Sequence, residues 1–265
     1  MLVPEGDVLR LTAARLHQAF AGSTLTRVDL RWPGVDDATL LGAVVTEVVA
    51  YGKHLLVRTD HGWTLRTHLR MEGSWRVART GSAQARGRSP YVRAVLGNDT
   101  WTAIGHRLGM LDVVRTRDEH VLIGHLGPDL LDDDLVVDVD LVREHLLGDR
   151  PQTPVAEALL DQTRVAGIGT LYASDSLFVT RVHPWTPLAA IPEDRLVLVL
   201  ATAQDLMRRA VAEGLGARKK LVHARTGRPC VRCGTAITVR QARRPPYERP
   251  IFFCPQCQSE QARWA

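Results

Sequence analysis

The chain has 265 residues and a formal net charge of +5, a length that allows two domains and a small metal module. No apolar run reaches the roughly 20 residues of a membrane span, so we expect a soluble, cytoplasmic monomer with no membrane partner. The charge is uneven: from Arg218 onward 11 Lys and Arg face 2 Asp and Glu, whereas the preceding residues carry 23 against 27. A block this basic favours a partner that carries phosphates.

The chain opens with an amphipathic helix and continues with short strands. Val8, Leu11, Leu16 and Phe20 recur at roughly helical spacing, and Gly22 is the expected stop. Up to about residue 115 the pattern changes to short β-branched runs separated by turns, which predicts a β-sandwich. The expected strands include residues 25–30, 44–49, 54–58, 63–66, 92–96 and 111–114.

The second half of the chain is predicted to be helical, after a boundary and linker at residues 126–134. Helices are expected at about 141–147, 155–162, 170–179 and 192–214. Thr153-Pro154 should open one of them, with the threonine hydroxyl as a cap. Gly167 and Gly169 can form a tight turn with outward backbone N–H groups, which suits an anion, although a plain helix–helix turn explains the same glycines.

All four cysteines lie near the C-terminus in two Cys-x2-Cys pairs, Cys230 with Cys233 and Cys254 with Cys257. Two such turns supply the tetrahedral thiolate shell that zinc prefers, so we expect one structural Zn²⁺. Two disulfides are the weaker alternative. With four protein ligands no coordination position stays open, so the metal would stiffen a basic hairpin and do no chemistry.

Lysine is rare in this chain. Of 34 basic residues only Lys53, Lys219 and Lys220 are lysines, so Lys53 stands alone in the first 217 residues. A lysine ammonium is a compact, titratable donor that arginine replaces poorly. Chance is the alternative explanation for the single lysine.

Four groups of residues follow one another along the chain: Pro4-Glu5-Gly6-Asp7, Gly52-Lys53-His54, Ala166-Gly167-Ile168-Gly169 with Tyr172 and Leu177-Phe178, and Arg249 ahead of Cys254-Pro255-x-Cys257-Gln258. Motifs in this order resemble those of DNA glycosylases of the formamidopyrimidine/endonuclease VIII (Fpg/Nei) family. The resemblance implies a multidomain α+β fold: an N-terminal helix plus β-sandwich at 1–125, a helix-two-turn-helix domain at 126–225 and a four-cysteine zinc ribbon at 226–265. It also implies binding of damaged DNA, duplex or single-stranded, in a cleft between domains, excision of the damaged base and cleavage of the abasic strand.

The resemblance assigns the chemistry to Pro4, Glu5 and Lys53. A free N-terminal proline is a secondary amine that can attack the sugar C1′, displace the base and form an iminium, which acidifies C2′ so that the 3′ phosphate leaves. Glu5 is suited to proton transfer, and Lys53 to the neighbouring phosphate or a proton.

The resemblance also implies six residues that contact DNA. Gly169, Thr170 and Arg249 would bind phosphates, and Arg70, Met71 and Arg107 would lie at the extruded base, with Met71 as the wedge. Solvated surface is the alternative for Glu5 and Arg249, and the sandwich core is the alternative for Met71.

The chain departs from the family pattern in three places. Met1-Leu2-Val3 precede Pro4, and an internal proline nitrogen is a tertiary amide, so we expect Val3 to be the true initiator, translated as methionine and removed. Thr170 stands where the family usually has asparagine, which offers one more donor and predicts weaker DNA binding here. His106-Arg107-Leu108 replaces the Arg-Arg-Phe of the purine-specific branch, and the segment 214–228 is too short for the capping loop of that branch. Both points favour the endonuclease VIII branch, which acts on oxidised pyrimidines, and within it the actinobacterial second type.

Two other functions remain open. A non-catalytic binder of damaged or branched DNA would have the same fold with Pro4 blocked. An unrelated zinc-ribbon protein of translation or transcription would share only the ribbon and the helical motif.

Overall fold

The computed structural model describes residues 4–259, which form two compact units that divide between His125 and Leu126. Within this described range, no helix combines the length and the apolar character needed to cross a membrane.

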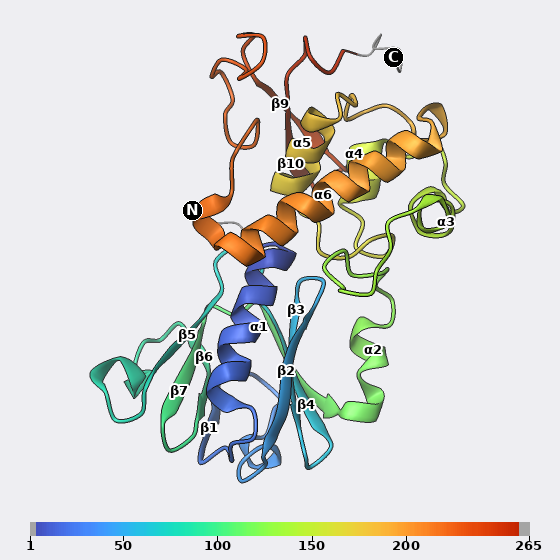
Figure 1. Ribbon diagram of the computed structural model, residues 1–265. Helices are drawn as coiled ribbons and strands as arrows, with labels where there is room; N and C mark the ends of the chain where they lie inside the picture. The colour runs from blue at the N-terminus through green and yellow to red at the C-terminus, as the bar shows by residue number, and fades with distance from the viewer. Residues whose placement is uncertain (1–3, 260–265) are drawn as a thin grey trace. The chain divides into compact units, whose positions relative to one another are not determined.

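The first unit consists of helix α1 (Gly6–Phe20) and two four-stranded antiparallel sheets, with strand orders β1-β6-β7-β5 and β2-β3-β4-β8 (Figure 1). The strands are β1 (Arg27–Leu30), β2 (Val45–Tyr51), β3 (His54–Thr59), β4 (Trp63–His68), β5 (Ser74–Arg79), β6 (Val92–Gly97), β7 (Trp101–His106) and β8 (Met110–Arg115); a short helix α2 (His120–Ile123) follows. The sandwich expected from the sequence is therefore confirmed. The sequence did not indicate β5 and β7, because their arginines, tryptophans and a glycine interrupt the β-branched pattern.

Helix α1 forms because its apolar residues recur on one side, which packs mainly on β2. Leu9, Leu16 and Phe20 are buried, and the chain leaves the helix through Gly22, whose φ of +74° suits glycine. The Val48 N–H donates to His17 Nδ1 at 3.2 Å, and Val45 exchanges backbone hydrogen bonds with the residues just after the helix. Helix and strand therefore run in opposite directions.

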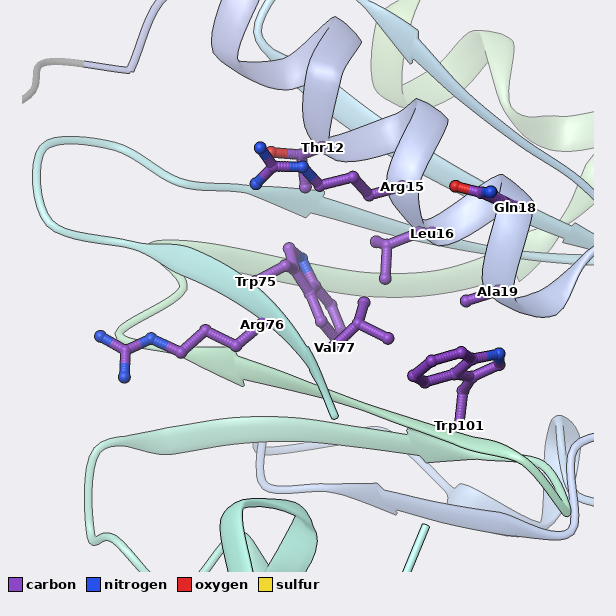
Figure 2. Close-up of a pocket in the computed structure, with 9 residues that line it drawn as sticks. All are labelled: Thr12, Arg15, Leu16, Gln18, Ala19, Trp75, Arg76, Val77 and Trp101. Carbon is purple, nitrogen blue, oxygen red and sulfur yellow. The ribbon is translucent and has the colours of Figure 1, made fainter. Parts of the chain in front are cut away.

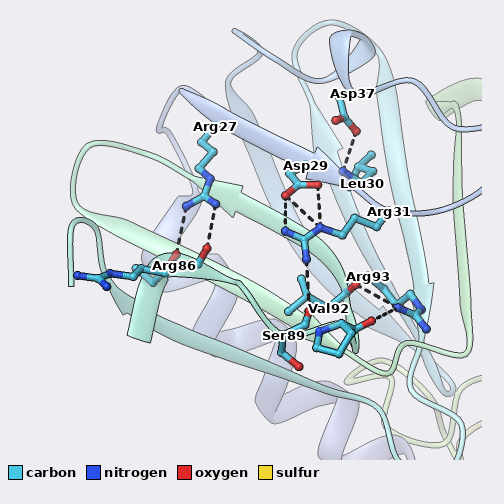
Figure 3. A network of polar contacts seen from close by, with 11 residues as sticks. Arg27, Asp29, Leu30, Arg31, Asp37, Arg86, Ser89, Val92 and Arg93 are labelled. Carbon is cyan, nitrogen blue, oxygen red and sulfur yellow. Dashed lines mark hydrogen bonds and ion pairs between the residues drawn. The ribbon is translucent and has the colours of Figure 1, made fainter. Parts of the chain in front are cut away.

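Arginines support the sheet around β1 (Figure 3). Arg27 donates to the carbonyl oxygens of Ala85 at 3.1 Å and Arg86 at 3.3 Å, which ties the loop before β6 to the sheet. Arg31 forms an ion pair with Asp29 at 2.7 Å. In this part of the sandwich the arginine side chains therefore stabilise the fold.

The second unit is built around helix α5 (Thr170–Val179), in which every residue from Leu171 to Phe178 is buried. Its other elements are α3 (Val139–Leu141), the π-helical segment η4 (Val142–Leu147), α4 (Val155–Leu159), α6 (Glu193–Glu213) and an antiparallel hairpin of β9 (Thr238–Ala242) and β10 (Arg249–Phe253). Short 3₁₀ helices connect elements within each unit. The first unit has η1 (Asp37–Thr39), η2 (Ala83–Arg86) and η3 (Thr116–Asp118), and the second has η5 (Leu188–Ala190) and η6 (Leu215–Ala217). A helix that is buried on all sides needs neighbours on every side, and those of α5 include α6 and β10.

Two local predictions for this unit are wrong. Leu130 and Leu131, expected in a linker, are buried in the core, and the Leu130 carbonyl accepts from Gln204 Nε2 at 3.0 Å. Helix α4 has Pro154 rather than Thr153 as its N-cap and ends at Leu159. It ends early because the Asp161 carboxylate accepts from the Thr163 N–H at 3.1 Å and from its hydroxyl at 2.8 Å, which forms a turn.

Candidate functional site

Pro4 and Glu5 lie at the start of α1. Pro4 is half-buried, and Glu5 is the N-cap residue, with its carbonyl oxygen accepting from the Val8 N–H at 2.9 Å. The Glu5 side chain is completely buried, so the interpretation of this carboxyl as solvated surface is wrong. The residues expected to be removed before Pro4, 1–3, lie outside the described part of the chain.

Lys53 lies in the turn between β2 and β3, and the packing of β2 on α1 brings this turn to the start of the helix. From the contact between His17 and Val48, five strand residues lead to Lys53, about 16 Å along β2. In the opposite chain direction, 13 residues lead back from His17 to Pro4, about 20 Å along α1. Because the two elements are antiparallel, Pro4, Glu5 and Lys53 lie at the same end of the first unit.

A second turn at that end is formed by residues 69–73, between β4 and β5, because His68 is the strand partner of His54. Met71 in this turn is 51% exposed, so the alternative that placed it in the sandwich core is wrong. Arg70 has a φ of +49° and its backbone N–H donates to His68 Nδ1 at 2.8 Å. The turn therefore holds Met71 outward on a backbone fixed by a histidine.

Arg107 lies in the third turn of this end, between β7 and β8. It also has a left-handed backbone, with φ of +47°. Its guanidinium forms an ion pair with Glu72 and stacks over the Tyr91 ring at 4.2 Å. Arg107 is thus held beside the turn that carries Met71.

Beneath these turns lies a basic cluster that the sequence did not indicate, in which His54 and Arg66 are buried and His68 is partly buried. The rings of His54 and His68 are 5.0 Å apart, and Arg66 Nη1 is 3.2 Å from His54 Nδ1 while Arg66 also pairs with Asp112 at 2.6 Å. Burial, followed by the charge of nearby cations, lowers the pKa of His68 to about 4. Burial, followed by His68 and Arg66, lowers the pKa of His54 to about 3. Both rings are therefore neutral near pH 7 and can accept hydrogen bonds.

In the second unit the glycine turn leads directly into α5. Gly167 has a φ of +100° and its N–H donates to Gln162 Oε1 at 3.1 Å, while Gln162 Nε2 donates to the Ile168 carbonyl at 3.0 Å. Gly169 is the N-cap residue of α5 and makes no side-chain cap, since it is a glycine. The Thr170 hydroxyl lies 3.3 Å from His223 Nε2. Gln162 and His223 shape this turn, and neither was found from the sequence.

A buried carboxylate on α5 fixes the basic segment of the chain. Asp175 accepts three backbone hydrogen bonds, from Leu221 at 2.9 Å, Val222 at 3.0 Å and His223 at 3.1 Å. Burial raises the pKa of Asp175, against the opposing effect of these N–H groups. One helix therefore positions both Thr170 and the segment that begins with Arg218, Lys219 and Lys220. A single carboxylate in an otherwise apolar helix was the available sequence signal.

Arg249 lies toward the first turn of the same helix. The Phe252 N–H donates to Ser174 Oγ at 3.1 Å, and Cys254 packs in one cluster with Phe178, so β10 runs in the direction of α5. Arg249 is then about 10 Å before Phe252, and Gly169 about 8 Å before Ser174. Arg249 is exposed, and within residues 4–259 it has no carboxylate partner.

The four cysteines meet in one cluster that has the geometry of a metal site. All four sulfur atoms lie within 4.8 Å of one another, with Cys230 and Cys257 3.9 Å apart and Cys233 and Cys254 3.4 Å apart. A tetrahedral zinc site with bonds of about 2.3 Å requires sulfur separations of about 3.8 Å, whereas a disulfide requires about 2.05 Å. None of the four forms a disulfide, so the disulfide alternative is wrong.

Comparison with known proteins agrees with this geometry. The family model described as "Formamidopyrimidine-DNA glycosylase N-terminal domain" matches residues 3–107, and that described as "Formamidopyrimidine-DNA glycosylase H2TH domain" matches residues 126–220. A Streptomyces coelicolor protein named "Probable endonuclease 8 2" is 41% identical over 97% of this chain and 94% of its own length. The Mycolicibacterium smegmatis "DNA-(apurinic or apyrimidinic site) lyase Nei2" is 36% identical over 97% of this chain and 99% of its own.

Among solved structures, Lactococcus lactis formamidopyrimidine-DNA glycosylase bound to DNA with an AP site has the same fold. Its TM-score is 0.82 at 22% sequence identity, and the match covers 97% of this chain and 100% of that one. The sequence identity to the bacterial relatives, the two matching family models and the order of the motifs lead to one assignment. The chain belongs to the formamidopyrimidine-DNA glycosylase/endonuclease VIII (Fpg/Nei) family.

Proposed function

We propose that this protein is a bifunctional DNA glycosylase and AP lyase that excises oxidised pyrimidines and then cleaves the abasic strand. The observation that supports the proposal is that Pro4, Glu5 and Lys53 lie at one end of the first unit, where the turns with Met71 and Arg107 also lie. An amine, a buried carboxyl and an ammonium are the groups that this chemistry needs.

Pro4 acts as the nucleophile once it is the first residue of the mature chain. Its secondary amine forms a bond to C1′ as the C1′–base bond breaks, and opening of the sugar leaves a cationic iminium that needs no added proton. Loss of a C2′ proton then expels the 3′ phosphate. Glu5, buried beside Pro4, is placed to move these protons, and Lys53 to bind the phosphate next to the lesion.

Each unit offers its own groups for binding DNA. In the second unit, Gly169 and Thr170 present the start of α5 to a phosphate, and the exposed Arg249 grips a neighbouring one. In the first unit, Met71 fills the space that the extruded base vacates, with Arg70 and Arg107 beside it. His223 Nε2 lies 3.3 Å from the Thr170 hydroxyl, beside this phosphate position.

Two observations support pyrimidines as the substrate class. Leu108, in the place of the stacking phenylalanine of the purine branch, is buried and offers no exposed ring. The relatives at 36% identity or above carry endonuclease 8 or lyase names, whereas several named formamidopyrimidine-DNA glycosylase are 26–34% identical.

One zinc ion fits the cysteine cluster. Cys230, Cys233, Cys254 and Cys257 would all bind it, which leaves no position for water or substrate. Zinc would supply the positive charge that holds four thiolates together, and through them the shape of the hairpin that carries Arg249.

Borohydride trapping on an oligonucleotide with an abasic site tests this function. One form of the protein begins Met-Pro4, so that methionine removal exposes the proline; the other retains residues 1–3. We expect a covalent adduct only with the exposed proline, and Glu5→Gln should retain DNA binding but lose strand cleavage. If an exposed Pro4 gives no adduct while DNA binds tightly, the protein is a non-catalytic binder of damaged DNA.

A further inference from the structure

The first unit contains a groove between α1 and the sheet that ends in β5 (Figure 2). It has a volume of about 720 Å³, which is large enough for several side chains of a partner. Its floor is apolar and is formed by Leu16, Ala19, Trp75, Val77 and Trp101, and its other lining residues are Thr12, Arg15, Gln18 and Arg76. None of the residues in the proposed DNA site lines it.

The groove follows the edge of a strand. β5 is the last strand of its sheet and pairs only with β7 among the described strands. Trp75, Arg76 and Val77 all line the groove, although consecutive residues of a strand point to opposite faces. Residues of both faces can contribute only where the groove runs along the strand edge. Such an edge offers backbone groups that pair with an added extended strand.

Several arginines of the first unit are paired with carboxylates. Arg31, Arg58, Arg66 and Arg107 each form an ion pair with a carboxylate. Arg15 and Arg76 are exposed and form no ion pair within residues 4–259. Figure 2 shows the Arg15 side chain above the Trp75 indole and the Arg76 side chain below it, with both guanidinium groups extending to the left in this view. Both charged residues that line the groove are thus cations with no carboxylate partner in the described part of the chain, which favours an anionic occupant.

The indole rings favour a peptide over a nucleic acid. Arg79 already stacks over Trp101 at 4.5 Å, and the Trp75 ring N–H is bonded to Thr67 Oγ1 at 3.2 Å. The rings thus form a fixed apolar floor rather than open platforms on which bases could stack. Two cations are also few for a nucleic-acid backbone but match two carboxylates.

We propose that this groove docks an extended acidic segment of a partner protein, which pairs with the edge of β5. Its alternate apolar side chains lie on the floor between Trp75 and Trp101, and its carboxylates meet Arg15 and Arg76. Arg15 is about 16 Å along α1 from Pro4, so docking leaves the DNA-processing end accessible. The proposal does not depend on the catalytic assignment, since it uses none of those residues.

Fluorescence anisotropy with a labelled peptide of alternating aspartate and leucine tests the docking. The comparison probes are a lysine–leucine peptide, an aspartate–serine peptide and an oligothymidylate of similar length. We expect the aspartate–leucine peptide to bind most tightly, and Arg15→Glu and Arg76→Glu each to weaken it by about tenfold, from the loss of one charged contact. Arg117→Glu, at a side chain that is 84% exposed and outside the groove, is the matched control and should have no effect.

Borohydride trapping and the circular dichroism spectrum should remain unchanged in Arg15→Glu and Arg76→Glu, which separates docking from catalysis and from folding. Absence of binding at millimolar aspartate–leucine peptide would overturn the proposal. So would equal loss in Arg117→Glu, or an oligothymidylate that binds more tightly than the peptide and loses more affinity in the groove variants.

Discussion

His68→Asn tests whether the buried histidine pair beneath the turns is neutral. The native pKa of His68 is about 4, below the value of about 6.5 expected in the unfolded chain. A lowered pKa in the folded state means that His68 stabilises the fold above pH 6.5, and that this contribution is lost as the pH falls toward 4. Between about pH 7.5 and pH 5 the loss is about 2 kcal/mol for His68. Asparagine cannot ionise but can still accept the Arg70 N–H.

Urea unfolding of the full chain measures this effect, since four of the six tryptophans, Trp32, Trp63, Trp75 and Trp101, lie in the first unit. In His68→Asn the decrease in free energy of unfolding between the two pH values should be smaller by about 2 kcal/mol than in the unchanged protein. His61→Asn is the matched control, because that ring is 51% exposed and stays in water in both states. Equal pH dependence in His68→Asn and the unchanged protein would refute the burial argument.

Four other substitutions test the remaining assignments. Cys254→Ser should release zinc and abolish DNA binding while the sandwich stays folded; retained affinity in protein shown to be free of zinc by atomic absorption would contradict the role of the ribbon. Arg249→Ala should weaken binding to all sequences and reduce the slope of log K against log salt by about 0.9, and an unchanged slope counts against a phosphate contact. Met71→Ala should change stability by less than about 0.5 kcal/mol but reduce base extrusion, read from 2-aminopurine opposite the lesion; a large loss of stability would restore the core interpretation. Asp175→Asn replaces one acceptor oxygen by an NH₂ group and should lower the free energy of unfolding by about 2 kcal/mol and weaken DNA binding, so an unchanged melting temperature would show that the three N–H groups need no carboxylate.

The helices and strands with regular apolar spacing were predictable, and those whose ends depend on side-chain contacts were not. Helix α5 was expected at 170–179 and lies at Thr170–Val179, because Gly169 leaves one clear start. Helix α4 was expected to reach residue 162, but it ends earlier because the Asp161 carboxylate accepts a hydrogen bond from the Thr163 backbone N–H. Composition alone does not say whether an aspartate continues a helix or closes a turn.

The cysteine cluster was predictable because two short Cys-x2-Cys motifs supply all four ligands. The contacts that hold the other site residues in place were not predictable, since they join residues far apart in the chain: Arg66 with His54, Asp175 with residues 221–223, and His223 with Thr170. A motif names the groups that do chemistry, whereas the residues that hold them depend on packing that no local pattern encodes. The roles of Pro4, Glu5 and Lys53 and the division of the second unit at residue 225 stay predictions.

Hydrogen bonds connect the segments that carry the four cysteines to the end of helix α5 and the residues that follow it. Arg232, between the first two cysteines, donates to the carbonyl oxygens of Phe178 at 2.6 Å and Val179 at 3.0 Å, which terminate α5. Gln258, just after the last cysteine, bonds the Cys254 N–H at 3.0 Å and the Val182 carbonyl at 2.9 Å. The ribbon is therefore difficult to replace by the ribbon of another protein. A chimera would also need matching residues at 178–182, or the last carbonyl groups of α5 would lose their hydrogen-bond donors.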